Sequence, residues 1–165
     1  MFELLDDPAY RHVLLNHLPT IGLALSWCAL VAALALRDRV AMQIGLLMIA
    51  LTAGSSIPVG MAGDDAYPAI FDELNGTGRD WLDYHAYLGD TWLPVIYFNA
   101  VAALIAFIAG TARNHLLLAS SAGIVLITIG GLAAGVVIGG AGGKIKHEEF
   151  RLYDPPDYEA SDKVR

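Results

Sequence analysis

The segment LLLASSAGIVLITIGGLAAGVVIGGAGG, residues 116–143, contains no charged side chain. A helix of about 20 apolar residues spans the hydrocarbon core of a bilayer, so this segment is long enough to cross a membrane. Inside the bilayer the backbone polar groups must bond to one another, which favours a helix for such a segment. This stretch therefore indicates an integral membrane protein rather than a water-soluble domain.

Three further uncharged runs precede this segment, at residues 20–36, 40–63 and 91–112. The whole chain has 165 residues, of which 56% are hydrophobic and 16% are charged. Soluble domains carry more charge, about 25% of their residues. The sequence predicts an all-α fold with one membrane domain, residues 1–165, built as a four-helix transmembrane bundle. Its spans are expected at about 17–36, 40–62, 88–112 and 116–143.

Short connections join these spans into two helical hairpins, which places both termini on the same side of the membrane. An outer linker, residues 63–87, would join the hairpins, and a polar tail, residues 144–165, would follow them. The hairpin loops carry Arg37, Arg39 and Arg113. Because short cytoplasmic loops are enriched in Lys and Arg, we expect a bacterial inner-membrane protein with its termini in the periplasm.

Three histidines, His17, His85 and His147, are expected at one membrane level, because two spans begin there and another ends there. Imidazole is a common ligand of transition metals and of haem iron. The sequence thus predicts a b-type haem held by these histidines, or a transition-metal ion held by them together with Asp64 and Glu148. The remaining alternative is that the histidines are hydrated side chains at the membrane interface and bind nothing.

Pro19 has two interpretations. It can occupy the first turn of the first span, where its missing N–H costs nothing, and the sequence favours this position. If the helix instead begins near Pro8, Pro19 leaves the carbonyl of Leu15 unbonded and bends the helix around His17.

A glycine stripe marks the last span. Its members recur every four residues, and they are Gly131, Gly135, Gly139 and Gly143. Small residues at this spacing lie on one face of a helix and let a second helix approach closely, so we expect helix packing along the stripe. The alternative is that a flat macrocycle lies against this face.

The two hairpins contain a weak repeat, since VAAL begins at residue 31 and again at residue 101. In each hairpin a histidine precedes this segment and an arginine follows it. A duplicated hairpin would place His17 and His85 at equivalent positions about an axis along the membrane normal.

Several segments resemble a widespread group of four-helix bacterial integral membrane proteins, a domain of unknown function. They are NHLP at 16–19, AGDD at 62–65 and GGKIKHEEF at 142–150. Members of this group open with N-H-[LF]-P and often end in G-G-x-[IL]-x-[HY]-x-E. This chain differs at residues 62–64, where the group tends to have T-G-E. The resemblance implies the four-helix membrane fold and an accessory role near redox proteins, with haem binding.

Two functions follow as hypotheses. The first is an accessory membrane subunit of a respiratory or photosynthetic electron-transfer complex, with a haem or metal near the outer face. The second is a purely structural subunit of a larger membrane assembly, which the acidic tail RLYDPPDYEASDKVR, residues 151–165, favours because it could lie along a partner. The sequence contains no phosphate-binding loop or basic nucleic-acid patch, and we expect no catalytic activity of its own.

Overall fold

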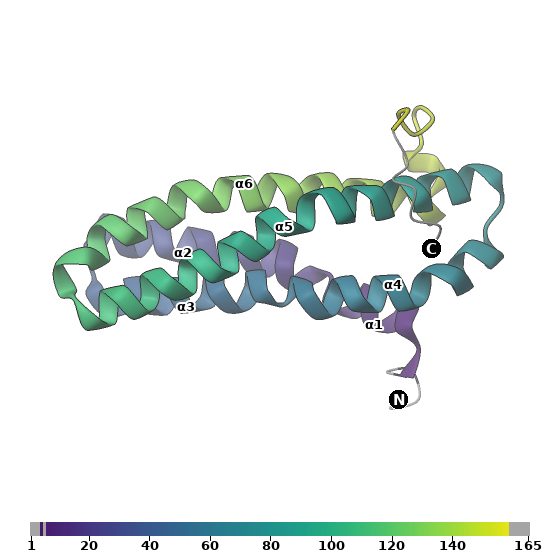
Figure 1. The fold of residues 1–165 in the computed structure, drawn as a ribbon. Coiled ribbons are helices and arrows are strands. Elements are labelled where there is room, and N and C mark those ends of the chain that lie inside the picture. The colour runs from purple at the N-terminus through teal and green to yellow at the C-terminus, as the bar shows by residue number, and fades with distance from the viewer. Residues whose placement is uncertain (1–3, 5, 159–165) are drawn as a thin grey trace.

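The computed structural model describes residue 4 and residues 6–158. Within them the chain is helical and forms no strand, and four helical rods pack along one another (Figure 1). Each rod is long and apolar enough to cross a membrane, and the rods cover Pro8–Leu36, Arg39–Glu73, Gly76–Ala112 and Asn114–Lys146. The predicted four-helix bundle is therefore confirmed, and the chain is a multi-pass membrane protein.

The first rod has three parts, namely α1 (Pro8–Leu15), the π-helical turn η2 (Leu18–Gly22) and α2 (Leu23–Leu36). The carboxylate of Asp7 accepts a hydrogen bond from the Ala9 N–H at 2.8 Å and caps α1. Pro19 lies in the π-helical turn, where a wider turn accommodates its ring and its missing N–H. The first rod thus begins at Pro8, so the favoured interpretation, in which Pro19 lies in the first turn of the span, is wrong.

The second rod comprises α3 (Arg39–Gly54) and α4 (Ser56–Glu73). Asp38 caps α3, because its carboxylate accepts a hydrogen bond from the Ala41 N–H at 2.8 Å. Arg37 adopts a left-handed conformation with φ 53°, which ends α2 and allows the tight connection to α3.

The third and fourth rods are the uninterrupted helices α5 (Gly76–Ala112) and α6 (Asn114–Lys146), and a short 3₁₀ turn, η3 (Glu148–Phe150), follows. Only Leu74 and Asn75 separate α4 from α5, so most of the predicted linker at 63–87 is helical. The charged residues there mark where the apolar runs stop, not where the helices stop. Arg79 helps α4 to end, because its Nε donates to the Phe71 carbonyl at 2.9 Å.

The rods pack differently at the two ends of the bundle. The end with the arginine-bearing loops is called here the loop end, and the end where α1 begins and α6 ends is called the terminal end (Figure 1). Toward the loop end α2, α3, α5 and α6 share one core, which includes Leu30, Leu46, Ile49 and Leu117. Toward the terminal end α1 packs on α4 and α5 packs on α6, which leaves the hairpins as two layers.

The glycine stripe of α6 divides between these two regions. Gly131 and Gly135 are buried, and added Cβ atoms would lie 2.8 Å from Asn99 Nδ2 and 3.6 Å from Thr20 Cγ2, respectively. An added Cβ at Gly139 would meet no atom within 4 Å, and one at Gly143 would meet only Phe150, at 4.0 Å. Close helix packing along the stripe therefore involves its two glycines nearer the loop end.

Candidate functional site

The predicted ligands are not gathered into one cluster. His17 is exposed and precedes η2 without a side-chain capping hydrogen bond. Asp64 is exposed on α4, and Glu148 lies 3.5 Å from Arg151. Among the described residues no three His, Cys, Asp or Glu side chains are placed to hold one metal ion.

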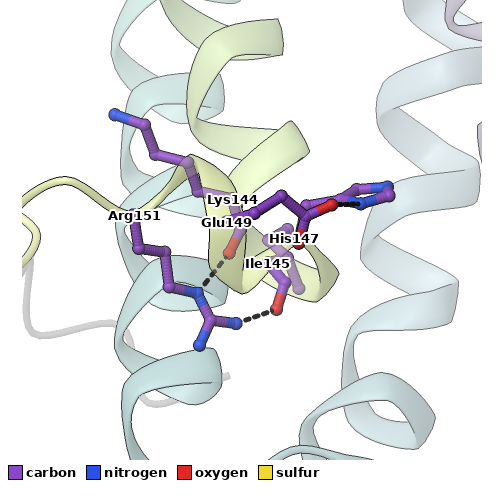
Figure 2. Close-up of polar contacts among 5 residues, drawn as sticks. All are labelled: Lys144, Ile145, His147, Glu149 and Arg151. Atoms are coloured by element: carbon purple, nitrogen blue, oxygen red, sulfur yellow. Dashed lines mark hydrogen bonds and ion pairs between the residues drawn. The ribbon is translucent and has the colours of Figure 1, made fainter.

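His147 belongs to the structure that ends α6 (Figure 2). Its Nδ1 lies 3.0 Å from Glu149 Oε1, and its ring stacks on Phe150 with the ring centroids 5.0 Å apart. A backbone hydrogen bond at Glu149 and the nearby His147 lower the pKa of the Glu149 carboxyl from its ordinary value. Both partners of this pair are exposed, so the pair contributes little to stability.

Arg151 caps the end of α6. Its Nε donates to the Lys144 carbonyl at 2.7 Å, and its Nη2 donates to the Ile145 carbonyl at 2.6 Å (Figure 2). The last carbonyls of a helix have no partner within the helix, and a cationic donor suits the negative end of its dipole. The segment GGKIKHEEFR therefore has a structural role in the folded chain.

His85 reaches from α5 to the backbone of α6. Its Nδ1 lies 3.0 Å from the carbonyl oxygen of Ile138. Gly142, one turn farther along α6, leaves room for the imidazole, because a Cβ there would lie 3.1 Å from His85 Cε1.

His12 makes the same contacts in the other hairpin. It reaches from α1 to α4, and its Nδ1 lies 2.9 Å from the carbonyl oxygen of Val59. Gly63, one turn farther along α4, leaves room for its ring, because a Cβ there would lie 2.9 Å from His12 Nδ1.

The receiving helices carry matching pentapeptides, VGMAG at 59–63 and IGGAG at 138–142. In both, the first residue supplies the carbonyl, the fourth is a buried alanine and the fifth is the glycine against the imidazole ring. The two hairpins thus share a local arrangement in which the counterpart of His85 is His12 and not His17. The repeated [VI]-G-x-A-G pattern is the sequence signal that points to this pair.

The two imidazoles approach each other between the hairpins. The ring centroids of His12 and His85 are 6.1 Å apart, and the ring planes are inclined at 83°. A carbonyl only accepts hydrogen bonds, so each Nδ1 donates, and in the neutral imidazole Nε2 is then the nitrogen with a lone pair for a metal. A metal–imidazole bond of about 2 Å plus roughly 1 Å from nitrogen to ring centre, taken twice, gives about 6 Å. The spacing suits one metal atom between two imidazoles.

One of the following two polar contacts joins the two layers at this end of the bundle, and the other lies within the first hairpin. The Tyr67 hydroxyl of α4 donates to the Asp83 carboxylate of α5. Arg11, next to His12, lies 3.9 Å from Asp65 of α4.

The comparisons with known proteins name no relative. A scan against protein-family models, a search of curated proteins and a search of solved structures each found no match. The resemblance to four-helix bacterial membrane proteins therefore remains a prediction from the quoted segments.

Proposed function

We propose that this chain is an accessory integral-membrane subunit of a respiratory or photosynthetic electron-transfer complex, and that it holds a b-type haem between His12 and His85. The observation that carries the proposal is the approach of two imidazoles from opposite hairpins, with ring centroids 6.1 Å apart. Facing helices of a bundle can supply the two axial ligands of a haem iron in this way.

The donor set fits a haem better than a bare ion. A structural zinc site usually needs four protein ligands, and calcium needs several oxygen atoms. Within the described part of the chain no third His, Cys or carboxylate joins the two imidazoles in a ligand cluster. A haem needs only two protein ligands, because its macrocycle supplies the other four.

The neighbouring residues would hold the imidazoles in place. The carbonyls of Val59 and Ile138 accept hydrogen bonds from the two Nδ1–H groups. These bonds fix the ring orientations and make each Nε2 more basic. Gly63 and Gly142 let the rings lie against the helix backbones. A haem held by His12 and His85 would supply one-electron transfer.

The proposed site lies toward the terminal end of the bundle, away from the basic loops. Arg37, Arg39 and Arg113 support a cytoplasmic position for those loops in a bacterial inner membrane. The termini and the imidazole pair would then lie on the periplasmic side, where an electron-transfer partner could approach the haem.

The test is the absorption spectrum of the detergent-purified chain. We expect a Soret band that is lost in His12→Ala and in His85→Ala. The matched controls His17→Ala and His147→Ala should keep it, because neither residue belongs to the pair. A colourless wild-type chain that takes up no added haem would refute the proposal. Bound metal that is lost in the same two variants would replace haem with an ion at this pair.

The purely structural alternative rests on the tail at residues 151–165, part of which packs on the chain itself. The described part of the tail folds back onto its own chain: Tyr153 lies against Trp81 with ring centroids 6.2 Å apart, and Tyr158 contacts Tyr84 and Tyr87 at 5.4 and 4.8 Å. Residues 159–165 lie outside the described part of the chain. The tail through Tyr158 therefore packs partly on its own chain, while Leu152 and Tyr153 remain exposed.

A further inference from the structure

Two nitrogen donors near the imidazole pair are buried without a partner. Within the described residues, Arg11 Nε and Trp81 Nε1 have no hydrogen-bond acceptor. The indole of Trp81 is 1% exposed, so solvent does not satisfy it. The other two unpartnered buried atoms there are oxygens, Asn99 Oδ1 and Ser121 Oγ, and they lie nearer the loop end.

These donors lie on the two helices that carry the histidines, α1 and α5. Arg11 directly precedes His12 in α1, and Trp81 precedes His85 by about one turn in α5. Both helices run from the terminal end toward the loop end, so each donor lies on the terminal side of its histidine. Each hairpin thus carries one unpartnered N–H donor on the terminal side of its imidazole.

The surroundings of both donors favour an anionic acceptor. The guanidinium Nη2 of Arg11 lies 3.9 Å from the Asp65 carboxylate, and its Nε has no hydrogen-bond partner. Lys144 Nζ lies 4.3 Å above the Trp81 ring and adds positive charge there. Native proteins rarely leave buried donors unbonded, so such groups call for an explanation, which a bound ligand can supply. A b-type haem carries two carboxylate groups on one edge, one for each donor.

We infer that Arg11 and Trp81 anchor the two carboxylates of the haem held by His12 and His85, so that this edge of the cofactor faces the terminal end. The inference rests on the proposed function and adds the orientation of the cofactor. Both are positioning residues, because neither contacts the iron. Hydrogen bonds to carboxylates are among the stronger ones in proteins, so each anchor should be measurable in the affinity.

The experiment compares iron protoporphyrin IX with its dimethyl ester, in which both carboxylates are esterified. Each is titrated into the haem-free, detergent-purified full chain, and binding is followed by the Soret band. We expect the wild type to bind the free acid about tenfold or more tightly than the ester, the effect of at least one charged hydrogen bond. In Arg11→Gln and Trp81→Phe this preference should fall, and in the double variant the two affinities should become nearly equal.

The spectrum distinguishes an anchor from a general structural role. Because the axial ligands are unchanged, the bis-imidazole spectrum should persist in both variants. Trp81→Phe also keeps a ring beneath Lys144. The matched controls Arg113→Gln, at the loop end, and Trp92→Phe, whose side chain is 42% exposed, should keep the wild-type preference.

Failure of this inference differs from failure of the proposed function. If the wild type binds acid and ester equally, or if both variants keep the full preference, then Arg11 and Trp81 are not anchors even though haem binds. If the wild type binds neither compound, the proposed function and this inference both fall.

Discussion

Replacing Gly63 with alanine should lower haem affinity and leave the stability of the folded chain nearly unchanged. The new Cβ would lie 2.9 Å from His12 Nδ1 and 3.0 Å from His12 Cε1, too close for a non-bonded contact. Both atoms belong to the end of a side chain, so the imidazole can rotate away while the helices stay in place. Rotation breaks the hydrogen bond to the Val59 carbonyl and changes the position of the ring relative to His85.

For the folding free energy of Gly63→Ala, the cost of the lost hydrogen bond and the gain in helix propensity nearly cancel. Overpacking with a ring that could not move would cost about 1–3 kcal/mol. Because the ring can move, the main cost is one hydrogen bond, about 1 kcal/mol. Alanine in place of glycine within α4 returns about 1 kcal/mol through helix propensity. We therefore expect the stability of the chain without haem to change by less than about 1 kcal/mol, while haem affinity falls about tenfold or more.

The assay pairs thermal unfolding of the haem-free chain in detergent with haem titration. The matched control is Gly140→Ala in α6, where an added Cβ meets no atom within 4 Å. This control should gain about 0.5–1 kcal/mol of stability and bind haem like the wild type. If Gly63→Ala binds haem as tightly as Gly140→Ala, then the close contact between Gly63 and His12 does not position the imidazole.

Three further changes test other parts of the structure. Arg151→Gln frees the last carbonyls of α6 and should cost about 1 kcal/mol, with faster amide exchange confined to the end of that helix. Burial raises the pKa of Tyr158, and the charges of Asp83 and Asp80 raise it further. A raised folded-state value means that packing of the tail holds below the ordinary tyrosine pKa and weakens as the pH rises through the raised value. An alkaline absorbance titration should show this late ionisation, and Tyr158→Phe should remove it. Asp38→Ala removes the cap of α3 and should lower the stability by about 1 kcal/mol in thermal unfolding, whereas Asp38→Asn should retain most of it.

The fold was predictable because four uncharged runs leave little choice of structure in a bilayer. The helix ends were less predictable, since hydropathy reports where the bilayer stops and not where the backbone hydrogen bonds stop. Residues 63–73 show this: they are acidic and contain Pro68, yet α4 continues through them to Glu73. Asn75 and Gly76 mark the actual connection, as turn-forming residues do.

The site was predictable only in part. The even number of spans predicts histidines from both hairpins at one end, and in the structure the rings of His12 and His85 meet there, 6.1 Å apart. A helix start at Pro19 would place His17 at the end of the span and His12 beyond it, whereas the helix begins at Pro8 and includes His12. The contacts of His12 depend on side chains and carbonyls distant in sequence, which periodicity does not reveal. The paired VGMAG and IGGAG segments are the sequence signal for the contacts of His12 and His85.

The π-helical turn at Leu18–Gly22 also determines in which direction around the helix axis the side chains of α1 point. A π turn adds one residue to a helix, and one residue corresponds to about 100° of rotation around the axis. Every side chain before the turn, including His12, is therefore rotated relative to the α2 residues that pack in the common core. Deleting one residue within 18–22 would restore regular winding, leave α2 seated and swing the first imidazole off the seam between the hairpins. The inserted residue thus lets α2 pack in the common core while α1 packs on α4 with His12 facing the second hairpin.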